Sequence, residues 1–125
     1  MSAREDTLFW AAEPRTAALH ALVAPAGESA VEVAKLCGLR VCEAPLAPAL
    51  YGVYFQDRKT IVLDCALSAA ARSFTLWHEL GHYLHAHRYA PQVSARAAEG
   101  FCDGFACRAT GTDPAAADLL FATDA

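Results

Sequence analysis

The order of apolar and polar residues predicts helices in the first third of the chain. Pro14 suits the first position of a helix, and the alanines and leucines behind it extend that helix to about Ala24. Ser29 and Glu32 have the spacing of a capping box, which marks the start of a helix. The pattern therefore predicts a second, short helix over residues 30–37.

The middle of the chain changes to an extended pattern. Residues 51–55 and 60–63 are rich in aromatic and β-branched side chains, and a short polar segment separates them. Such a pair of runs predicts a β-hairpin. Residues 39–42 resemble a further strand. This strand would follow directly after the short helix, which ends at Gly38.

The last third returns to a helical pattern. Ser68 predicts the cap of a long helix over residues 69–87, and further helices are expected over 94–110 and 115–121. Helices, then a small sheet, then helices again is the order of an α+β fold. We expect a small antiparallel sheet packed with helices, with the helix 69–87 at the centre.

Composition and charge restrict the classes of function. The 125 residues are 55% hydrophobic, which indicates one globular domain over residues 1–125. The net charge is −4, and arginines and lysines are scattered, which disfavours direct binding to nucleic acid or to anionic lipid. The acidic N-terminus does not resemble a secretory signal, and every apolar run is too short to span a membrane.

The cysteines indicate a reducing compartment. Their number is odd and no Cys-x-x-Cys pair occurs, which disfavours a disulfide framework and a cysteine zinc site. We expect five buried thiols in a reducing environment, and hence a cytoplasmic protein. They are Cys37, Cys42, Cys65, Cys102 and Cys107.

The strongest chemical signal is the sequence His-Glu-Leu-Gly-His in the long predicted helix. His78 and His82 are four residues apart, so their side chains project from nearly the same face of a helix. Two imidazole nitrogens so placed suit one Zn²⁺ ion. Glu79 lies on the flank of that face, where its carboxylate can take a proton from a water that zinc has acidified.

The other side of this helix predicts how it packs. Trp77, Leu80 and Leu84 share the face opposite the histidines and should anchor the helix in the core. Gly81 is costly inside a helix, so we expect a neighbouring element to approach closely there.

A catalytic zinc site needs a third protein ligand. A histidine six residues beyond His82 is absent, because Arg88 holds that position. Glu99, on the next predicted helix, is the candidate, although an acid in the first turn of a helix also suits solvent. Asp103 shares the face of Glu99 and can accept the second ring N–H of a ligating histidine, or else be a solvated acid.

Several other residues allow both a functional and a structural interpretation. His85 falls on the ligand face one turn further along and could contact substrate, or be a polar residue near the helix end. Tyr83 and Tyr89 could donate to a tetrahedral intermediate or simply pack. Arg72 could brace the helix or a substrate loop, or lie in solvent, while His20 in an apolar helix favours a structural role.

Two blocks resemble the ImmA/IrrE metallopeptidase family. The first begins at Arg72 and includes Phe74-Thr75 and the His-Glu-Leu-Gly-His segment. The second reads Glu-x-x-Cys-Asp-x-Phe-Ala from Glu99. The likeness covers roughly residues 28–110, and it implies a minimal zincin-like domain that holds one zinc ion per chain. By this resemblance the zinc ligands are His78, His82 and Glu99, and Glu79 is the general base.

The resemblance also implies a substrate. Members of this family cleave helix-turn-helix repressors of the XRE type, which switches on genes of mobile elements or of stress responses in bacteria and phages. We further expect the strand 60–63 to be a sheet edge, along which an extended substrate would pair.

The alternative is a zinc-binding docking module that regulates a transcription factor or toxin without catalysis. Residues 107–110 depart from the family's usual Leu-Leu-Met-Pro, which favours this alternative, whereas the intact Glu79 favours an enzyme. The oligomeric state stays open.

Overall fold

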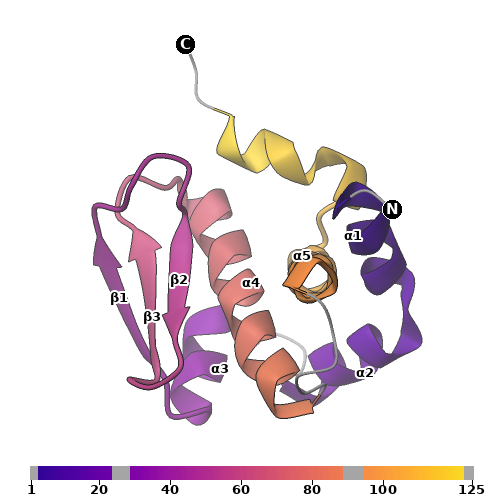
Figure 1. The fold of residues 1–125 in the computed structure, drawn as a ribbon, viewed down its shortest axis with the longest axis horizontal. Coiled ribbons are helices and arrows are strands. Elements are labelled where there is room, and N and C mark those ends of the chain that lie inside the picture. The colour runs from indigo at the N-terminus through magenta and orange to yellow at the C-terminus, as the bar shows by residue number, and fades with distance from the viewer. Residues whose placement is uncertain (1–2, 24–28, 89–94, 123–125) are drawn as a thin grey trace.

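The computed structural model describes residues 3–23, 29–88 and 95–122, and its mixture of helices with one small sheet confirms the predicted α+β class. Figure 1 shows the long helix α4 between the sheet and helix α5, with α1 and α2 beyond α5. The elements are α1 (Ala3–Ala12), α2 (Pro14–Val23), α3 (Ala30–Leu36), β1 (Arg40–Ala44), β2 (Gly52–Phe55), β3 (Thr60–Asp64), α4 (Ala69–Arg88), α5 (Ala95–Thr110) and the 3-10 helix η1 (Pro114–Phe121).

Capping residues and a glycine that can be recognised in the sequence lie at several of these helix boundaries. The Ser29 hydroxyl accepts a hydrogen bond from the backbone N–H of Glu32 at 3.2 Å and caps α3. The Ser68 hydroxyl accepts from the N–H of Ala71, also at 3.2 Å, and begins α4. Gly38 follows α3 with φ of +75°, a conformation that glycine adopts without steric cost.

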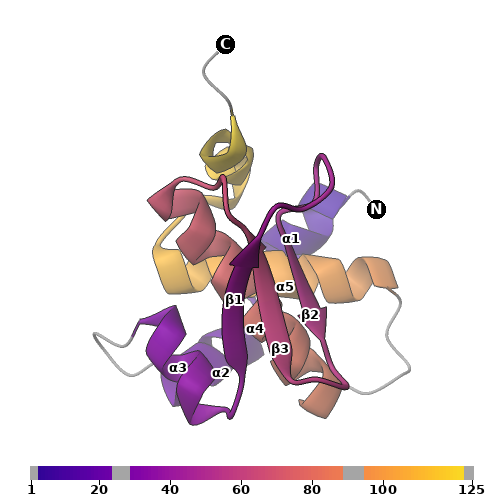
Figure 2. The same ribbon diagram turned by 90° about the vertical axis from the view of Figure 1, so that its left-hand side faces the viewer.

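The sheet is mixed, so the prediction of an antiparallel sheet was wrong for one strand. β2 and β3 pair antiparallel as the predicted hairpin, but β1 pairs with β3 in parallel. The chain reverses once between β1 and β2 and again in the hairpin, so β3 runs in the same direction as β1. Figure 2 shows the resulting order, β1-β3-β2.

The expectation that strand 60–63 is an edge was also wrong. β3 lies in the middle of the sheet, where Ile61 and Leu63 are fully buried. The second strand of the hairpin fills the position between β1 and β2, which completes its backbone pairing on both sides. Among the described residues, the open edge nearest to α4 is β2.

The predicted core face of α4 is confirmed. Trp77, Leu80 and Leu84 are all buried in the main hydrophobic cluster. Gly81 explains the tight packing against α5: a Cβ added there would lie 3.0 Å from the Cα of Cys102. Any larger residue would therefore push the two helices apart and move the groups that they carry.

Helix α1 was not predicted, and it covers the far side of α5. Gly104 makes this contact, because a Cβ on it would lie only 2.6 Å from the backbone nitrogen of Ala11. The Trp10 and Phe101 rings meet edge to face with centroids 5.2 Å apart. Phe101 and Phe105 are fully buried beneath α1 and α2 and fix the rotation of α5.

The cysteines are free, as expected, but they are not all buried. Cys102 and Cys107 lie in the core, whereas Cys42 on β1 and Cys65 just after β3 are exposed. Across the described ranges, no helix combines the length and the apolar character needed to cross a membrane.

Candidate active site

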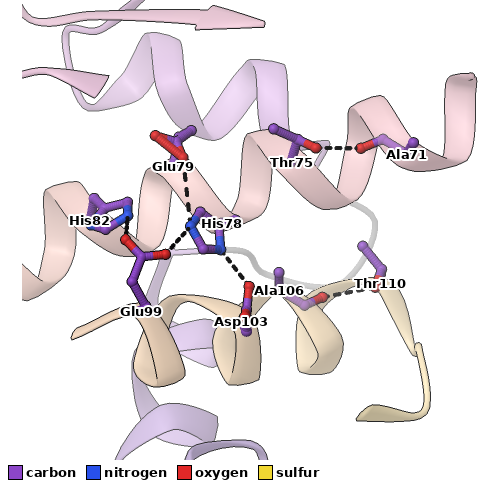
Figure 3. A network of polar contacts seen from close by, with 9 residues as sticks. All are labelled: Ala71, Thr75, His78, Glu79, His82, Glu99, Asp103, Ala106 and Thr110. Carbon is purple, nitrogen blue, oxygen red and sulfur yellow. Dashed lines mark hydrogen bonds and ion pairs between the residues drawn. The ribbon is translucent and has the colours of Figure 1, made fainter. Parts of the chain in front are cut away.

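His78 and His82 lie one turn apart on α4 and face α5. Their ring centroids are 5.0 Å apart. Figure 3 shows both imidazoles pointing toward Glu99, which extends from the first half of α5. The close approach of the two helices at Gly81 brings these three side chains together.

The Glu99 carboxylate contacts both histidines. One oxygen lies 3.1 Å from Nε2 of His78, and the other lies 2.9 Å from Nε2 of His82. Hydrogen bonds from the two rings hold the pKa of Glu99 well below its usual range, against a smaller opposing effect of burial. Glu99 is therefore an anion whose two oxygens point at the two ring nitrogens.

Asp103 orients His78 from the other side of the ring. Its Oδ1 lies 2.6 Å from Nδ1 of His78, so the carboxylate accepts the N–H at that atom and leaves Nε2 facing Glu99. Burial lowers the pKa of His78, but the hydrogen bonds to Asp103 and Glu99 outweigh burial and raise it to about 10. Without a metal, the imidazole is a cation held between two acids.

The donors in this cluster fit a zinc ion. Two imidazole Nε2 atoms and a carboxylate converge from two rigid helices, and nitrogen and oxygen donors of these types are usual zinc ligands. A metal cation would replace the ring protons that now link His78 and His82 to Glu99. The carboxylate behind Nδ1 of His78 is the partner that a ligating histidine usually has.

Cys102 is a competing donor. Its Sγ and one ring nitrogen each of His78 and His82 lie within 4.8 Å of one another. Burial, with smaller contributions from the acids around it, raises the pKa of this thiol well above its ordinary value. We favour Glu99, because its carboxylate is charged and contacts both ring nitrogens directly, whereas Cys102 is fully buried behind them.

Glu79 lies on the side of α4 that faces the sheet. Its Oε2 is 3.7 Å from Nε2 of His78, and the residue is 5% exposed. Burial raises its pKa, and the nearby acids add to this, while the two histidines oppose it. A carboxylate with a raised pKa is a stronger proton acceptor than one in water, which suits a general base.

Strand β2 passes directly over Glu79 because Gly52 has no side chain. A Cβ at Gly52 would lie 2.7 Å from Cγ2 of Thr75 and 3.3 Å from Cγ of Glu79. Thr75 is held in place, since its hydroxyl donates to the carbonyl of Ala71 at 2.7 Å. The sequence alone did not single out Gly52, although a glycine among aromatic strand residues is a signal of close approach.

These groups line a cleft of about 740 Å³ between β2, α4, α5 and η1. His78, Glu79, His82, Glu99 and Asp103 all contribute to its wall. Tyr51 and Phe121 also line it, and neither was a candidate from the sequence. Nothing local marks Phe121, because it reaches the cleft only through the packing of η1.

Of two further candidates on α4, His85 is a cleft residue, whereas Tyr83 is not among the residues that line the cleft. His85 lines it, with its ring 5.3 Å from that of Phe101, and burial together with His82 lowers its pKa. His85 is therefore neutral near pH 7. Tyr83 packs edge to face on Tyr54, with centroids 6.2 Å apart, and is half-buried.

The remaining candidates lie elsewhere. Arg72 is not a cleft residue; its Nε lies 2.8 Å from Glu43, and it braces the start of α4 against β1. His20 packs on Trp77 and Phe105, the structural role expected for it. Tyr89 lies outside the described residues.

The fold and the site together have the arrangement of a metallopeptidase-type hydrolase: His-Glu-x-x-His on a central helix, with an acid from the next helix. The family model of peptidase family M78, the IrrE N-terminal-like domain, matches residues 34–122, so the chain belongs to this family. The match includes η1 and so covers every element of the cleft. Neither curated proteins nor solved structures give a match.

Proposed function

We propose that this chain is a zinc-dependent endopeptidase. The observation that carries the proposal is the Glu99 carboxylate, whose two oxygens meet Nε2 of His78 and Nε2 of His82 beside the buried base Glu79. We assign His78, His82 and Glu99 as ligands of one zinc ion and Glu79 as the general base. Asp103 acts through His78 as a positioning residue.

The residues have distinct tasks in peptide hydrolysis. Bound zinc would supply a Lewis acid that acidifies water and polarises the peptide carbonyl. Glu79 takes the proton of the attacking water and returns it to the leaving amine. Asp103 keeps the proton of His78 on Nδ1, so that Nε2 stays available as a donor atom.

The substrate that we propose is a helix-turn-helix repressor of the XRE type, whose cleavage would derepress mobile-element or stress-response genes. The likeness of the two motif blocks to the ImmA/IrrE family supports this choice. Such a substrate requires the enzyme to act in the cytoplasm. The buried Glu79 beside β2 favours this proposal over a docking module, since a structural zinc site has no use for a base.

A substitution at the base tests the proposal. Glu79→Gln keeps the size of the side chain but cannot accept the proton, so the zinc-loaded variant should lose at least about a hundredfold in repressor cleavage. Its zinc content should match that of the wild type. Glu32→Gln, on the exposed side of α3 and outside the cleft, is the matched control. Full cleavage by Glu79→Gln would contradict the proposed role, whereas absence of cleavage by the zinc-loaded wild type would favour the docking module.

A further inference from the structure

Strand β2 offers an unpaired backbone edge along the cleft. Among the described strands it pairs only with β3, so its other edge has free N–H and C=O groups. β2 also runs alongside α4, because Gly52 meets Thr75 and Glu79 while Tyr54 meets Tyr83. An extended peptide added to this edge would pass the Glu79 carboxylate.

The two ends of the cleft differ in chemistry. At the Gly52 end, Tyr51 and Phe121 stack with centroids 4.3 Å apart, and Phe74 meets Phe121 edge to face at 5.9 Å. All three line the cleft, so this end has an aromatic wall built from the loop before β2, α4 and η1. Asp118 of η1 also lines the cleft. Figure 1 shows η1, which carries Phe121, across the same end of the molecule as the loop before β2.

The opposite end is polar. Its lining comes from the far end of β2 and the next turns of α4, and includes Tyr54, Gln56 and His85. The reacting position lies between the two ends, at His78, Glu79 and His82. A peptide in the cleft therefore has an aromatic wall on one side of its scissile bond and polar side chains on the other.

Large apolar side chains are exposed at the aromatic end, which favours binding of an apolar side chain of a peptide there. Leu50 and Tyr51 are 41% and 38% exposed beside the cleft, next to a wall of stacked rings. Large apolar groups gathered at the mouth of a cleft gain free energy when a ligand covers them. A large apolar side chain of a peptide would bury part of this surface.

The direction of β2 decides which side of the scissile bond meets this wall. Antiparallel pairing is slightly more stable per residue than parallel pairing, so we expect the peptide to run opposite to β2. Because β2 runs from Gly52 to Phe55, such a peptide would enter past Phe55 and leave past Gly52. Its residues C-terminal to the scissile bond would then lie at the aromatic end.

We propose that Tyr51, Phe74 and Phe121 form a subsite for a large apolar side chain immediately C-terminal to the scissile bond of an extended peptide paired with β2. The subsite rests on the proposed endopeptidase function, which it deepens by naming the substrate class. The preferred substrate segment is a stretch without regular structure, since a helix offers no free backbone groups to β2. Phe121 and Tyr51 determine specificity without touching the reacting atoms.

A peptide library tests the subsite by two separate readouts. The probe is a synthetic library of flexible peptides randomised at eight positions. Zinc-loaded wild type is used to map cleavage sites, and zinc-loaded Glu79→Gln is used to select bound peptides. We expect large apolar residues to be enriched about tenfold just after the cleaved bond and enriched likewise among bound peptides.

Variants of η1 connect the preference to Phe121. Phe121→Ala should abolish the enrichment, and Phe121→Trp should shift it toward smaller apolar residues, a change that a purely structural role would not produce. Leu119→Ala is the matched control, because Leu119 lies on the same element, is 74% exposed and does not line the cleft.

The outcomes separate the two proposals. Cleavage without apolar preference, or with the preference before the cleaved bond, would overturn the subsite and leave the endopeptidase standing. Selective binding of apolar peptides without cleavage would overturn the endopeptidase, and with it the position of the subsite relative to a scissile bond, and would leave only an apolar peptide-binding wall. A library neither bound nor cleaved would overturn both.

Discussion

The Oδ1 atom of Asp103 lies 2.6 Å from Nδ1 of His78, which joins the acid of α5 to the imidazole of α4 at the back of the site. The contact leaves Nε2 of His78 directed at Glu99, 3.1 Å away. In the proposed zinc site, one side chain of α5 thus orients a ligand and another completes the ligand set. The spacing of the two helices, set at Gly81 and Cys102, controls both.

The contact between Asp103 and His78 should strengthen zinc binding. Asp103→Asn removes the charge and weakens the acceptor at Nδ1, so zinc affinity should fall about 10- to 100-fold. Competition with a zinc-binding dye would measure the change. Asp57→Asn, in the exposed hairpin turn, is the control and should bind zinc like the wild type. Unchanged affinity in Asp103→Asn would show that Asp103 does not support the ligand.

Zinc binding should release a proton from His78. The pKa of this imidazole is about 10 in the metal-free protein, so at pH 8 Nε2 is protonated, and zinc must displace that proton. Calorimetric titration at pH 8 in buffers of different ionisation enthalpy should show about one proton released per zinc bound. Release of none would contradict the raised pKa.

The same shift predicts how pH affects the stability of the metal-free protein. The pKa of His78 rises from 6.5 to about 10 on folding, so its contribution is fully present below pH 6.5 and is lost as pH rises toward 10. Urea unfolding of the metal-free protein should therefore show a falling midpoint between pH 6.5 and 7.5, below the range in which thiols ionise. His78→Gln should remove most of this slope. A midpoint that rises over this interval would be inconsistent with a protonated His78.

Gly52 should control activity through the position of β2. In Gly52→Ala the new methyl group would meet Cγ2 of Thr75 at 2.7 Å, so the strand must move away from Glu79. We expect kcat/KM for the repressor to fall about tenfold or more, with zinc content unchanged, at a stability cost of about 1–3 kcal/mol. Adding Thr75→Ser removes that methyl group while keeping the hydroxyl bond to Ala71, and should restore much of the activity. Failure of this rescue would mean that the clash at Thr75 is not the cause.

Local periodicity explains what could be predicted from the sequence. His78 and His82 share a face because a helix repeats every 3.6 residues, and Trp77, Leu80 and Leu84 share the opposite face for the same reason. The prediction that Glu99 lies near the histidine face came from the resemblance to a family, and from Glu99 being the only acid between His82 and Asp103. Each of these signals lies within one or two helices.

Contacts between distant segments explain what was missed. The parallel pairing of β1 and the central position of β3 depend on where the chain places a strand after a reversal, which no local pattern records. Helix α1 is positioned by Gly104, almost a hundred residues later in the chain. Phe121 reaches the cleft by stacking on Tyr51, across 70 residues of sequence.

The most direct measurement of the central claim is the zinc content of the purified protein after dialysis, compared with Glu99→Gln and Cys102→Ala. We expect about one zinc per chain in the wild type and in Cys102→Ala, and a marked loss in Glu99→Gln. Zinc retained in Glu99→Gln but lost in Cys102→Ala would place the third ligand at the thiol and contradict the site described.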